Sequence, residues 1–128
     1  MKPEHTNGYS MAELMCVCLA KEIENEDIVI LGSFTPLAYA AYILAKLTHA
    51  PDMLYVAYSS VDAKPFRLSF LTSEAAAMQG GAAHWGMSEC INSFHLRGVA
   101  DVEAISSVQI DGNGDINLSV IGDYQQPR

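Results

Sequence analysis

The chain has 128 residues and a mass of 13.9 kDa, which leaves room for about one domain and excludes a self-contained enzyme of several domains. Half of its residues are hydrophobic and only 17% are charged, so a globular core is expected and a disordered protein is excluded. The net charge of −8 opposes contact with phosphate backbones and anionic membranes, so we expect neither a nucleic acid nor a membrane as partner.

The first predicted element is a helix over residues 11–24. Ser10 followed three positions later by Glu13 is the pattern of a capping box, and apolar residues then recur at helical spacing. The acidic residues after it are typical of a solvated helix end, so they are assigned no chemistry.

A long uncharged run follows at residues 28–45, near the minimum length of a membrane-spanning helix. Because Gly32, Ser33, Thr35 and Pro36 interrupt it, we instead predict a buried strand over 28–31, a turn, and a mostly buried helix over 36–47. A second apolar strand over 53–57 completes a right-handed crossover, as found in parallel sheets.

The second half of the chain is less regular. Residues 58–85 predict a long connection, residues 87–96 a helix, and residues 104–110 a third strand that is buried over 104–108. A tight turn over 111–114 then predicts a hairpin into residues 116–121. The predicted fold class is α/β, with a mainly parallel sheet flanked by helices in one domain.

The cysteines and the N-terminal residues indicate the cellular compartment in which the protein is expected. Cys16, Cys18 and Cys90 lack metal-ligand spacing and are interpreted as reduced core residues of a cytoplasmic protein, with no metal site. The first residues, which contain Glu4 and no continuous apolar stretch, do not match a signal peptide.

Ligands of open α/β sheets bind beyond the carboxyl ends of the strands. The loops expected there are residues 32–36, 58–62 and 111–117. The first of them opens a helix and presents backbone N–H groups that suit a carbonyl oxygen or a phosphate, although it also fits a plain strand-to-helix turn.

Other polar residues have simpler interpretations. His84 beside Trp85 could be a base or a stacking surface, but packing of the long connection onto the body is the favoured interpretation. Glu89 is expected to place favourable charge at a helix N-terminus. His49, at a helix end, and His95, within a helix, are assigned no role.

Several motifs in this order resemble the β subunit of family I CoA-transferases, of the glutaconate CoA-transferase type. They are Gly32-Ser33-Phe34-Thr35-Pro36-Leu37, Ala50-Pro51-Asp52 before an apolar strand, Gln109-Ile110-Asp111 with Gly114 and Asn117, and Ile121-Gly122-Asp123-Tyr124 with Pro127. The last two are the most specific, and the resemblance extends from about Ser10 to Arg128.

The resemblance implies a fold of the NagB/RpiA/CoA-transferase type and an active site between two homologous subunits, with this chain matching the N-terminal part of the β subunit. It also implies a glutamate nucleophile that passes through an acyl anhydride and a glutamyl-CoA thioester. CoA or acyl-CoA would then be the substrate, with no permanently bound cofactor.

The sequence departs from the family where that glutamate belongs. The family's Glu-Ser-Gly falls on Tyr58-Ser59-Ser60, and a phenol, with a reference pKa of about 10, cannot form an anhydride. Phe34 replaces a glycine, Asp115 replaces an asparagine, and the chain stops at Arg128 where relatives continue.

The residues expected at the site follow from this comparison. Tyr58 and Ser59 are the catalytic candidates, and Tyr58 is expected to donate a hydrogen bond to a thioester carbonyl. The candidates for binding substrate or CoA are Gly32, Ser33, Thr35, Ser60, Gln109, Asp111 and Asn117.

Three functions remain open from the sequence. The chain could work with an α-like subunit that supplies the missing groups, be a non-catalytic subunit or scaffold, or be an unrelated small-molecule binding domain. We also expect a dimer or heteromer, because apolar surface around Phe34, Tyr39 and Tyr42 would need covering.

Overall fold

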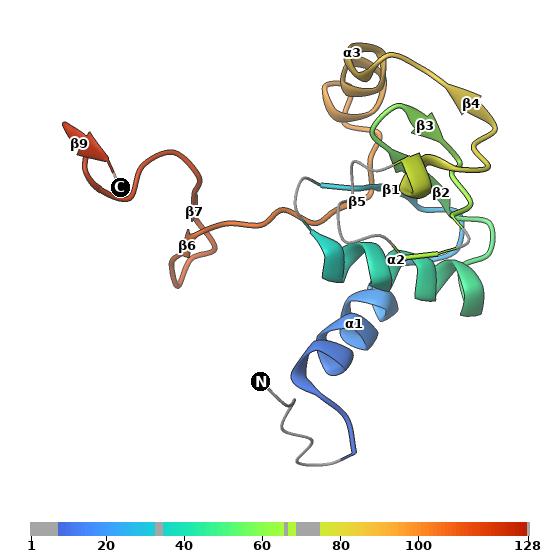
Figure 1. The fold of residues 1–128 in the computed structure, drawn as a ribbon, viewed down its shortest axis with the longest axis horizontal. Helices are drawn as coiled ribbons and strands as arrows, with labels where there is room; N and C mark the ends of the chain where they lie inside the picture. Colours follow the sequence, from blue (N-terminus) through green and yellow to red (C-terminus); the bar gives the residue numbers. More distant parts are fainter. Residues whose placement is uncertain (1–7, 33–34, 66, 69–74, 128) are drawn as a thin grey trace.

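A computed structural model describes residues 8–32, 35–65, 67–68 and 75–127 of the chain. It consists of a sheet with helices on both faces, from which the C-terminal residues extend to one side (Figure 1). We call residues 11–103 the sheet domain and residues 104–127 the C-terminal arm.

The predicted capping box is present at the start of α1 (Met11–Lys21). The Ser10 backbone N–H donates to the Glu13 carboxylate at 2.6 Å, and the Glu13 N–H donates to Ser10 Oγ at 3.2 Å. Together these bonds satisfy two of the helix's first N–H groups. The helix is therefore confirmed, although it ends three residues before the predicted boundary at residue 24.

The main sheet has the strand order β4-β3-β2-β1-β5. Its central strands β1 and β2 are parallel, and β5 pairs in parallel with the other side of β1, whereas β3 and β4 are antiparallel additions. The strands are β1 (Ile28–Ile30), β2 (Leu54–Ala57), β3 (Ser60–Val61), β4 (Ala83–His84) and β5 (Val102–Glu103). The predicted α/β class is confirmed, whereas β3 and β4 were not predicted.

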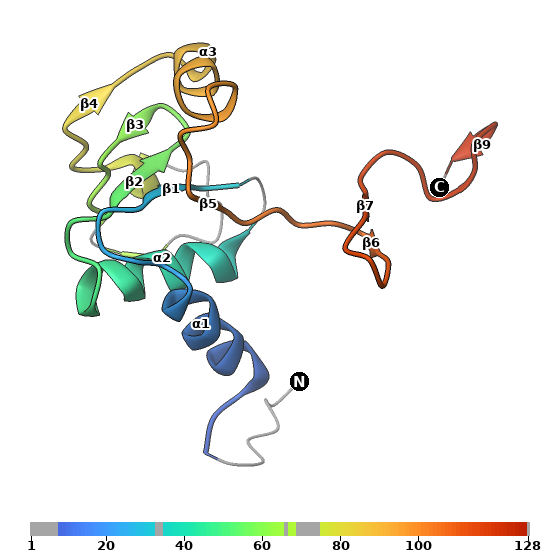
Figure 2. The same cartoon turned by 180° about the vertical axis from the view of Figure 1, so that it is seen from behind.

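The crossover between β1 and β2 is α2 (Pro36–Thr48), which begins at a proline as predicted. Together with α1 it covers one face of the sheet, and α3 (Met87–Cys90) with the π-helical turn η2 (Ile91–His95) covers the other. The reverse view in Figure 2 shows the same layers. Successive strand residues point to opposite faces of the sheet, so Val29 packs toward α2 while Ile30 packs toward Cys90.

Three tyrosines form the centre of the larger core. Tyr39 and Tyr42 are fully buried, and their rings lie 6.2 and 6.1 Å from that of Tyr55. The prediction that Tyr39 and Tyr42 leave apolar surface for a second subunit is therefore wrong, because β2 covers them within the chain. Phe34, which was part of that prediction, lies outside the described residues.

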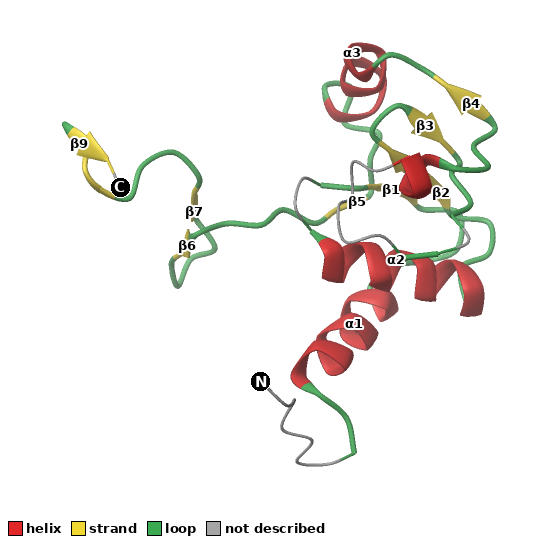
Figure 3. Ribbon diagram, viewed as in Figure 1, coloured by secondary structure: helices red, strands yellow, loops and turns green. Residues whose placement is uncertain are grey.

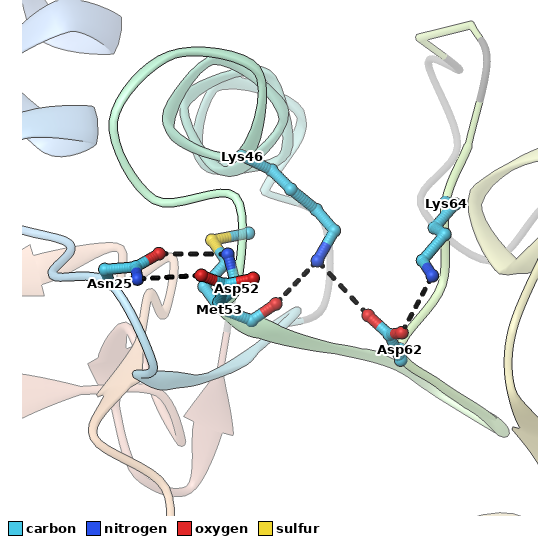
Figure 4. A network of polar contacts seen from close by, with 6 residues as sticks. All are labelled: Asn25, Lys46, Asp52, Met53, Asp62 and Lys64. Atoms are coloured by element: carbon cyan, nitrogen blue, oxygen red, sulfur yellow. Dashed lines mark hydrogen bonds and ion pairs between the residues drawn. The ribbon is translucent and has the colours of Figure 1, made fainter.

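Lys46 anchors the segment after β3 to α2 (Figure 4). Its Nζ donates to the Met53 carbonyl oxygen at 2.6 Å and pairs with Asp62 at 3.2 Å, and Asp62 also pairs with Lys64 at 3.1 Å. Desolvation acts to raise the pKa of Asp62, but the hydrogen bonds and charges of Lys64 and Lys46 outweigh it and hold that pKa below its usual value. This network holds the start of the long connection against the domain.

The prediction of a buried strand over residues 104–108 is wrong, whereas the predicted hairpin is confirmed, because Gln109–Ile110 pairs antiparallel with Ile116–Asn117. The sheet strand β5 lies earlier, at Val102–Glu103, and the arm forms small hairpins instead of a buried strand. Ile105 and Val108 are 56% and 68% exposed, so residues 104–108 are not a buried segment. The arm is mostly loop (Figure 3), with β6 (Gln109–Ile110), β7 (Ile116–Asn117), β8 (Gly122–Asp123) and β9 (Gln126–Pro127).

All three cysteines are free. Cys90 is buried as predicted, whereas Cys18 is exposed, so the prediction of a core residue is wrong there. Within the described ranges, no helix has the length and apolar character needed to cross a bilayer.

Candidate functional site

The carboxyl ends of β1, β2 and β5 meet at one edge of the sheet. Gly32, directly after Leu31, lies so close to β5 that an added Cβ would overlap the carbonyl oxygen of Ala104. The hydroxyl of Thr35 donates to the Gly32 carbonyl oxygen at 2.8 Å and fixes the turn that leads into α2. The close approach of the Ala104 carbonyl oxygen therefore requires a glycine at position 32.

Tyr58 follows β2 at the same edge. Its backbone is in the left-handed region, with φ of 50°, an uncommon conformation that a non-glycine residue adopts only when its surroundings hold it there. The phenol side chain is half-buried and lines a cavity beside α3.

That cavity has a volume of about 120 Å³ and mixed walls. Its apolar side is formed by the side chains of Ile30, Leu31, Val56, Met87, Cys90 and Ile91. Its polar groups are Gly32, Tyr58, His95 and Glu103. A small, mainly apolar space with a few convergent polar groups is the usual form of a binding site.

Two of these polar residues were not predicted. Glu103 ends β5, and its Oε1 lies 3.2 Å from Nε2 of His95 at the end of η2. A prediction of the third strand two residues earlier would have placed Glu103 at the carboxyl edge. The wrong strand boundary therefore concealed the carboxylate.

Cys90 lines the same cavity. Desolvation by burial, with a smaller effect of the Glu89 charge, raises the pKa of its thiol. The thiolate is therefore disfavoured, and Cys90 contributes an apolar wall.

The two serines after Tyr58 point elsewhere. Ser59 Oγ donates to the Met78 sulfur at 3.3 Å, and the buried Ser60 Oγ donates to the Met78 carbonyl oxygen at 2.8 Å. Neither serine lines the cavity at Tyr58. Donation of a hydrogen bond to a substrate by either hydroxyl would require its present bond to break, because each hydroxyl has a single proton.

The residues of the loop before α2 line two different cavities. Thr35 lines a second cavity of about 440 Å³, together with Leu19 and Ile105. Gly32 lines the cavity at Tyr58 instead. Ser33, the remaining predicted binding residue of this loop, lies outside the described residues.

The three predicted binding residues of the arm lie together, away from Tyr58. Asn117 Nδ2 donates to Gln109 Oε1 at 2.6 Å, and Asp111 Oδ1 accepts the N–H groups of Asn113 and Asp115 at 2.8 and 3.0 Å. Figures 1 and 2 both show this hairpin well to the side of the sheet. Within one chain, therefore, Gln109, Asp111 and Asn117 do not join the cavity at Tyr58.

Among the described residues, no group of three or more His, Cys, Asp or Glu side chains is arranged to hold a metal ion. The polar chemistry of the cavity consists of a phenol, an imidazole and a carboxylate. These groups can donate a hydrogen bond and transfer a proton.

No protein-family model matches the chain. It is similar to the B subunit of 3-oxoadipate CoA-transferase from Pseudomonas knackmussii, with 29% identity over 123 residues, 95% of this chain and 46% of that protein. It is also similar to the B subunit of glutaconate CoA-transferase from Acidaminococcus fermentans, with 28% identity over 130 residues, 98% of this chain and 48% of that protein.

Solved structures extend this similarity to the fold. The decarboxylase AibA/AibB matches with a TM-score of 0.83 and 27% identity, covering 91% of this chain and 48% of the other. Glutaconate CoA-transferase from Acidaminococcus fermentans matches with a TM-score of 0.77 and 26% identity, covering 94% and 48%.

This chain spans about half the length of the curated relatives it matches. The similarity covers nearly all of the chain in both sequence and structure. The predicted resemblance is thereby confirmed, and the chain is a homologue of the B subunits of family I CoA-transferases with the same α/β fold.

Proposed function

We propose that this chain is a β-like subunit that binds acyl-CoA thioesters and acts on them together with an α-like subunit. The observation that carries the proposal is its similarity, over 95% and 98% of its length, to B subunits of two CoA-transferases. The cavity beyond β1 and β2 supports it, since ligands of parallel sheets bind at that edge. We further propose that residues 1–128 correspond to the N-terminal part of such a subunit and act in the cytoplasm.

The α-like partner is supported by exposed apolar side chains. On α1 these are Met11, Met15 and Val17, and on the arm they are Ile105, Val108 and Ile110. Apolar patches of this kind are typical of subunit interfaces. A partner on these surfaces would also bring groups to the arm hairpin, which stands apart from the cavity at Tyr58 within one chain.

Tyr58 would contribute a hydrogen bond in this site. Its hydroxyl can donate to the thioester carbonyl oxygen, as one member of an oxyanion-stabilising pair with backbone N–H groups near Gly32. An ester formed on a phenol has no anhydride route onward, so the family's covalent route is not available at this position. The match to a decarboxylase supports a reaction other than CoA transfer on the same scaffold.

The first test is to purify the chain with an α-like subunit and titrate the complex with butyryl-CoA and free CoA. Saturable binding and turnover by the complex would support the proposal. Formation of the complex and binding without turnover of any acyl-CoA would favour the alternative, a non-catalytic subunit or scaffold. Absence of both would contradict the proposal and favour an unrelated binding domain.

The role of Tyr58 has a separate test by intact-protein mass after incubation with acyl-CoA thioesters. We expect no acyl or CoA adduct on Tyr58. In the active complex, Tyr58→Phe should lower turnover by roughly 10²-fold, the effect of removing one oxyanion donor. An adduct that maps to Tyr58 and vanishes in Tyr58→Phe would contradict the hydrogen-bonding role.

A further inference from the structure

A carboxylate and an imidazole lie within hydrogen-bond distance of each other on the wall of the small cavity, and the resemblance assigns neither of them a role. Glu103 and His95 approach within 3.2 Å, and both side chains are partly exposed, at 28% and 32%. They share the cavity with Tyr58 and Gly32. We propose that Glu103 is the proton-transferring group of this site, held in position by His95, and that its substrate is a short-chain acyl thioester. This inference rests on the proposed binding of acyl-CoA in the cavity.

Two backbone contacts fix the place of Glu103. It is paired with Ile30 in the parallel ladder between β5 and β1, so its position at the carboxyl edge is set by strand register. The next residue, Ala104, donates its N–H to the Tyr42 hydroxyl at 2.9 Å. Glu103 is therefore carried by a strand end with bonds on both sides, which is a firmer support than a free loop.

His95 is the side chain that can hydrogen-bond to Glu103 and hold it in position. Among the described residues that line this cavity, His95 is the single basic side chain. Tyr42 also lies close to Glu103, but desolvation, with a contribution from the Glu103 charge, raises the pKa of Tyr42 to about 12, so its hydroxyl keeps its proton. A carboxylate that is held by a neighbouring side chain beside an apolar pocket can act as a general base.

The volume of the cavity restricts the substrate. An apolar cavity of about 150 Å³ takes up benzene, so the cavity here, at about 120 Å³, suits an acyl chain of a few carbons. The apolar walls from Ile30, Val56 and Met87 would hold the chain, while Tyr58 would reach the thioester carbonyl oxygen. Glu103 would then face the carbon next to that carbonyl.

The step is a reversible proton transfer. The Glu103 carboxylate takes a proton from the carbon next to the thioester carbonyl and the C–H bond breaks. Its electron pair forms a C=C bond to the carbonyl carbon, and the C=O π pair moves onto the oxygen to give an enolate. The hydroxyl of Tyr58 donates a hydrogen bond to that oxygen. Return of the proton from Glu103 restores the thioester, and in D2O a deuteron returns instead.

The experiment uses the full chain with its α-like partner and butyryl-CoA as the probe in D2O. Deuterium at the carbon beside the carbonyl is measured by mass spectrometry, and the dissociation constant of butyryl-CoA is measured by titration. We expect exchange in the wild type and a loss of roughly 10²-fold or more in Glu103→Gln, the usual contribution of a general base. Glu89→Gln, which changes a carboxylate outside this cavity, serves as the matched control and should exchange like the wild type.

His95 is tested as a positioning residue. His95→Ala should slow exchange by about tenfold with little change in the dissociation constant, while His95→Gln, which keeps a donor for Glu103, should recover most of the rate. Circular dichroism melts of each variant check that the fold persists. Equal rates in His95→Ala and the wild type would overturn the positioning role.

The outcomes separate the two proposals. Binding with no exchange in the wild type, or exchange that survives Glu103→Gln, overturns the inference and leaves the proposed function standing. Absence of binding of both butyryl-CoA and CoA by the complex overturns the proposed function and the inference together. Exchange that Glu103→Gln abolishes and Glu89→Gln preserves, with binding retained in both, supports the inference.

Discussion

The sheet domain and the C-terminal arm contain similar local turn signals but differ in what covers their apolar side chains. In the sheet domain, Val29 and Tyr55 are fully buried between layers, whereas in the arm Val108 and Ile110 are 68% and 70% exposed. The arm lies to the side of the sheet in both ribbon views. An apolar, β-rich segment therefore becomes a core strand only where other elements are available to cover it.

The largest expected effect comes from Gly32→Ala at the sheet edge. The new Cβ would overlap the Ala104 carbonyl oxygen. Because the Cβ position is fixed by the backbone of residue 32 and the oxygen is itself backbone, neither can move without disturbing the pairing of β1 and β5. We expect a loss of about 3 kcal/mol in the free energy of unfolding, measured by urea denaturation. Gly112→Ala in the arm is the control, because nothing lies within 4 Å of its added Cβ, and it should change stability by less than about 0.5 kcal/mol.

Ile110→Asp tests whether the arm's exposed side chains meet a partner. The substitution places a charge in an apolar interface, so we expect at least about tenfold weaker binding to the α-like subunit, close to 1.4 kcal/mol, measured by titration calorimetry. The melting temperature of the isolated chain should stay unchanged, since Ile110 is exposed there. Leu47→Asp, at an exposed position of α2, is the control, and an equal loss of affinity in that variant would contradict a specific role of the arm.

Asp62→Asn tests the anchor between α2 and the segment after β3. The lowered pKa of Asp62 means that its carboxylate stabilises the fold above its ordinary pKa of 3.8, and that this stabilisation is lost as pH falls through the lowered folded value. We expect the variant to lose about 1 kcal/mol at neutral pH, a modest figure because the pair is partly solvated. The difference from wild type should shrink between about pH 5 and pH 3 in urea melts.

The control for Asp62→Asn is Asp111→Asn in the arm. That carboxylate accepts backbone N–H groups, and an asparagine keeps an oxygen that can accept them. A smaller loss, with little dependence on pH, is expected. An Asp62→Asn loss that stays constant down to pH 3 would show that the two lysines do not stabilise the charged form.

Elements with a local signal could be predicted from the sequence. The capping box of Ser10 and Glu13, the proline at the start of α2 and the Asp111 turn each depend on residues within a few positions of one another. The strands β3 and β4 could not be predicted, because two-residue strands are defined by pairing between positions such as Ser60 and His84. That pairing depends on the path of the long connection between them.

The candidate site shows the same division. Gly32 and Tyr58 lie at one edge because each directly follows a parallel strand that the apolar pattern reveals. Glu103 ends a strand that the sequence analysis placed at the wrong residues, and His95 lies at the end of a helical turn. No spacing in the sequence indicates the contact between them. Gln109, Asp111 and Asn117 carry specific motifs, but a motif does not tell where its hairpin lies relative to the sheet.

The smallest expected effect concerns a polar atom inside the sheet domain. Tyr55 is fully buried between Tyr39 and Tyr42, and within the described part of the chain its hydroxyl has no hydrogen-bond partner. Burial raises the pKa of this hydroxyl, so it stays protonated and bears the full desolvation cost. Tyr55→Phe keeps the ring and removes that cost, so stability should rise by about 0.5 to 1 kcal/mol and the melting temperature by a few degrees.

Tyr42→Phe is the matched opposite, because the Tyr42 hydroxyl accepts the Ala104 N–H at 2.9 Å and its removal leaves that donor unpaired. We expect Tyr42→Phe to lose about 1 kcal/mol in the same thermal melts. A loss in Tyr55→Phe as large as in Tyr42→Phe would mean that the Tyr55 hydroxyl is bonded in solution, and that the core of the sheet domain has no unpaired group at this position.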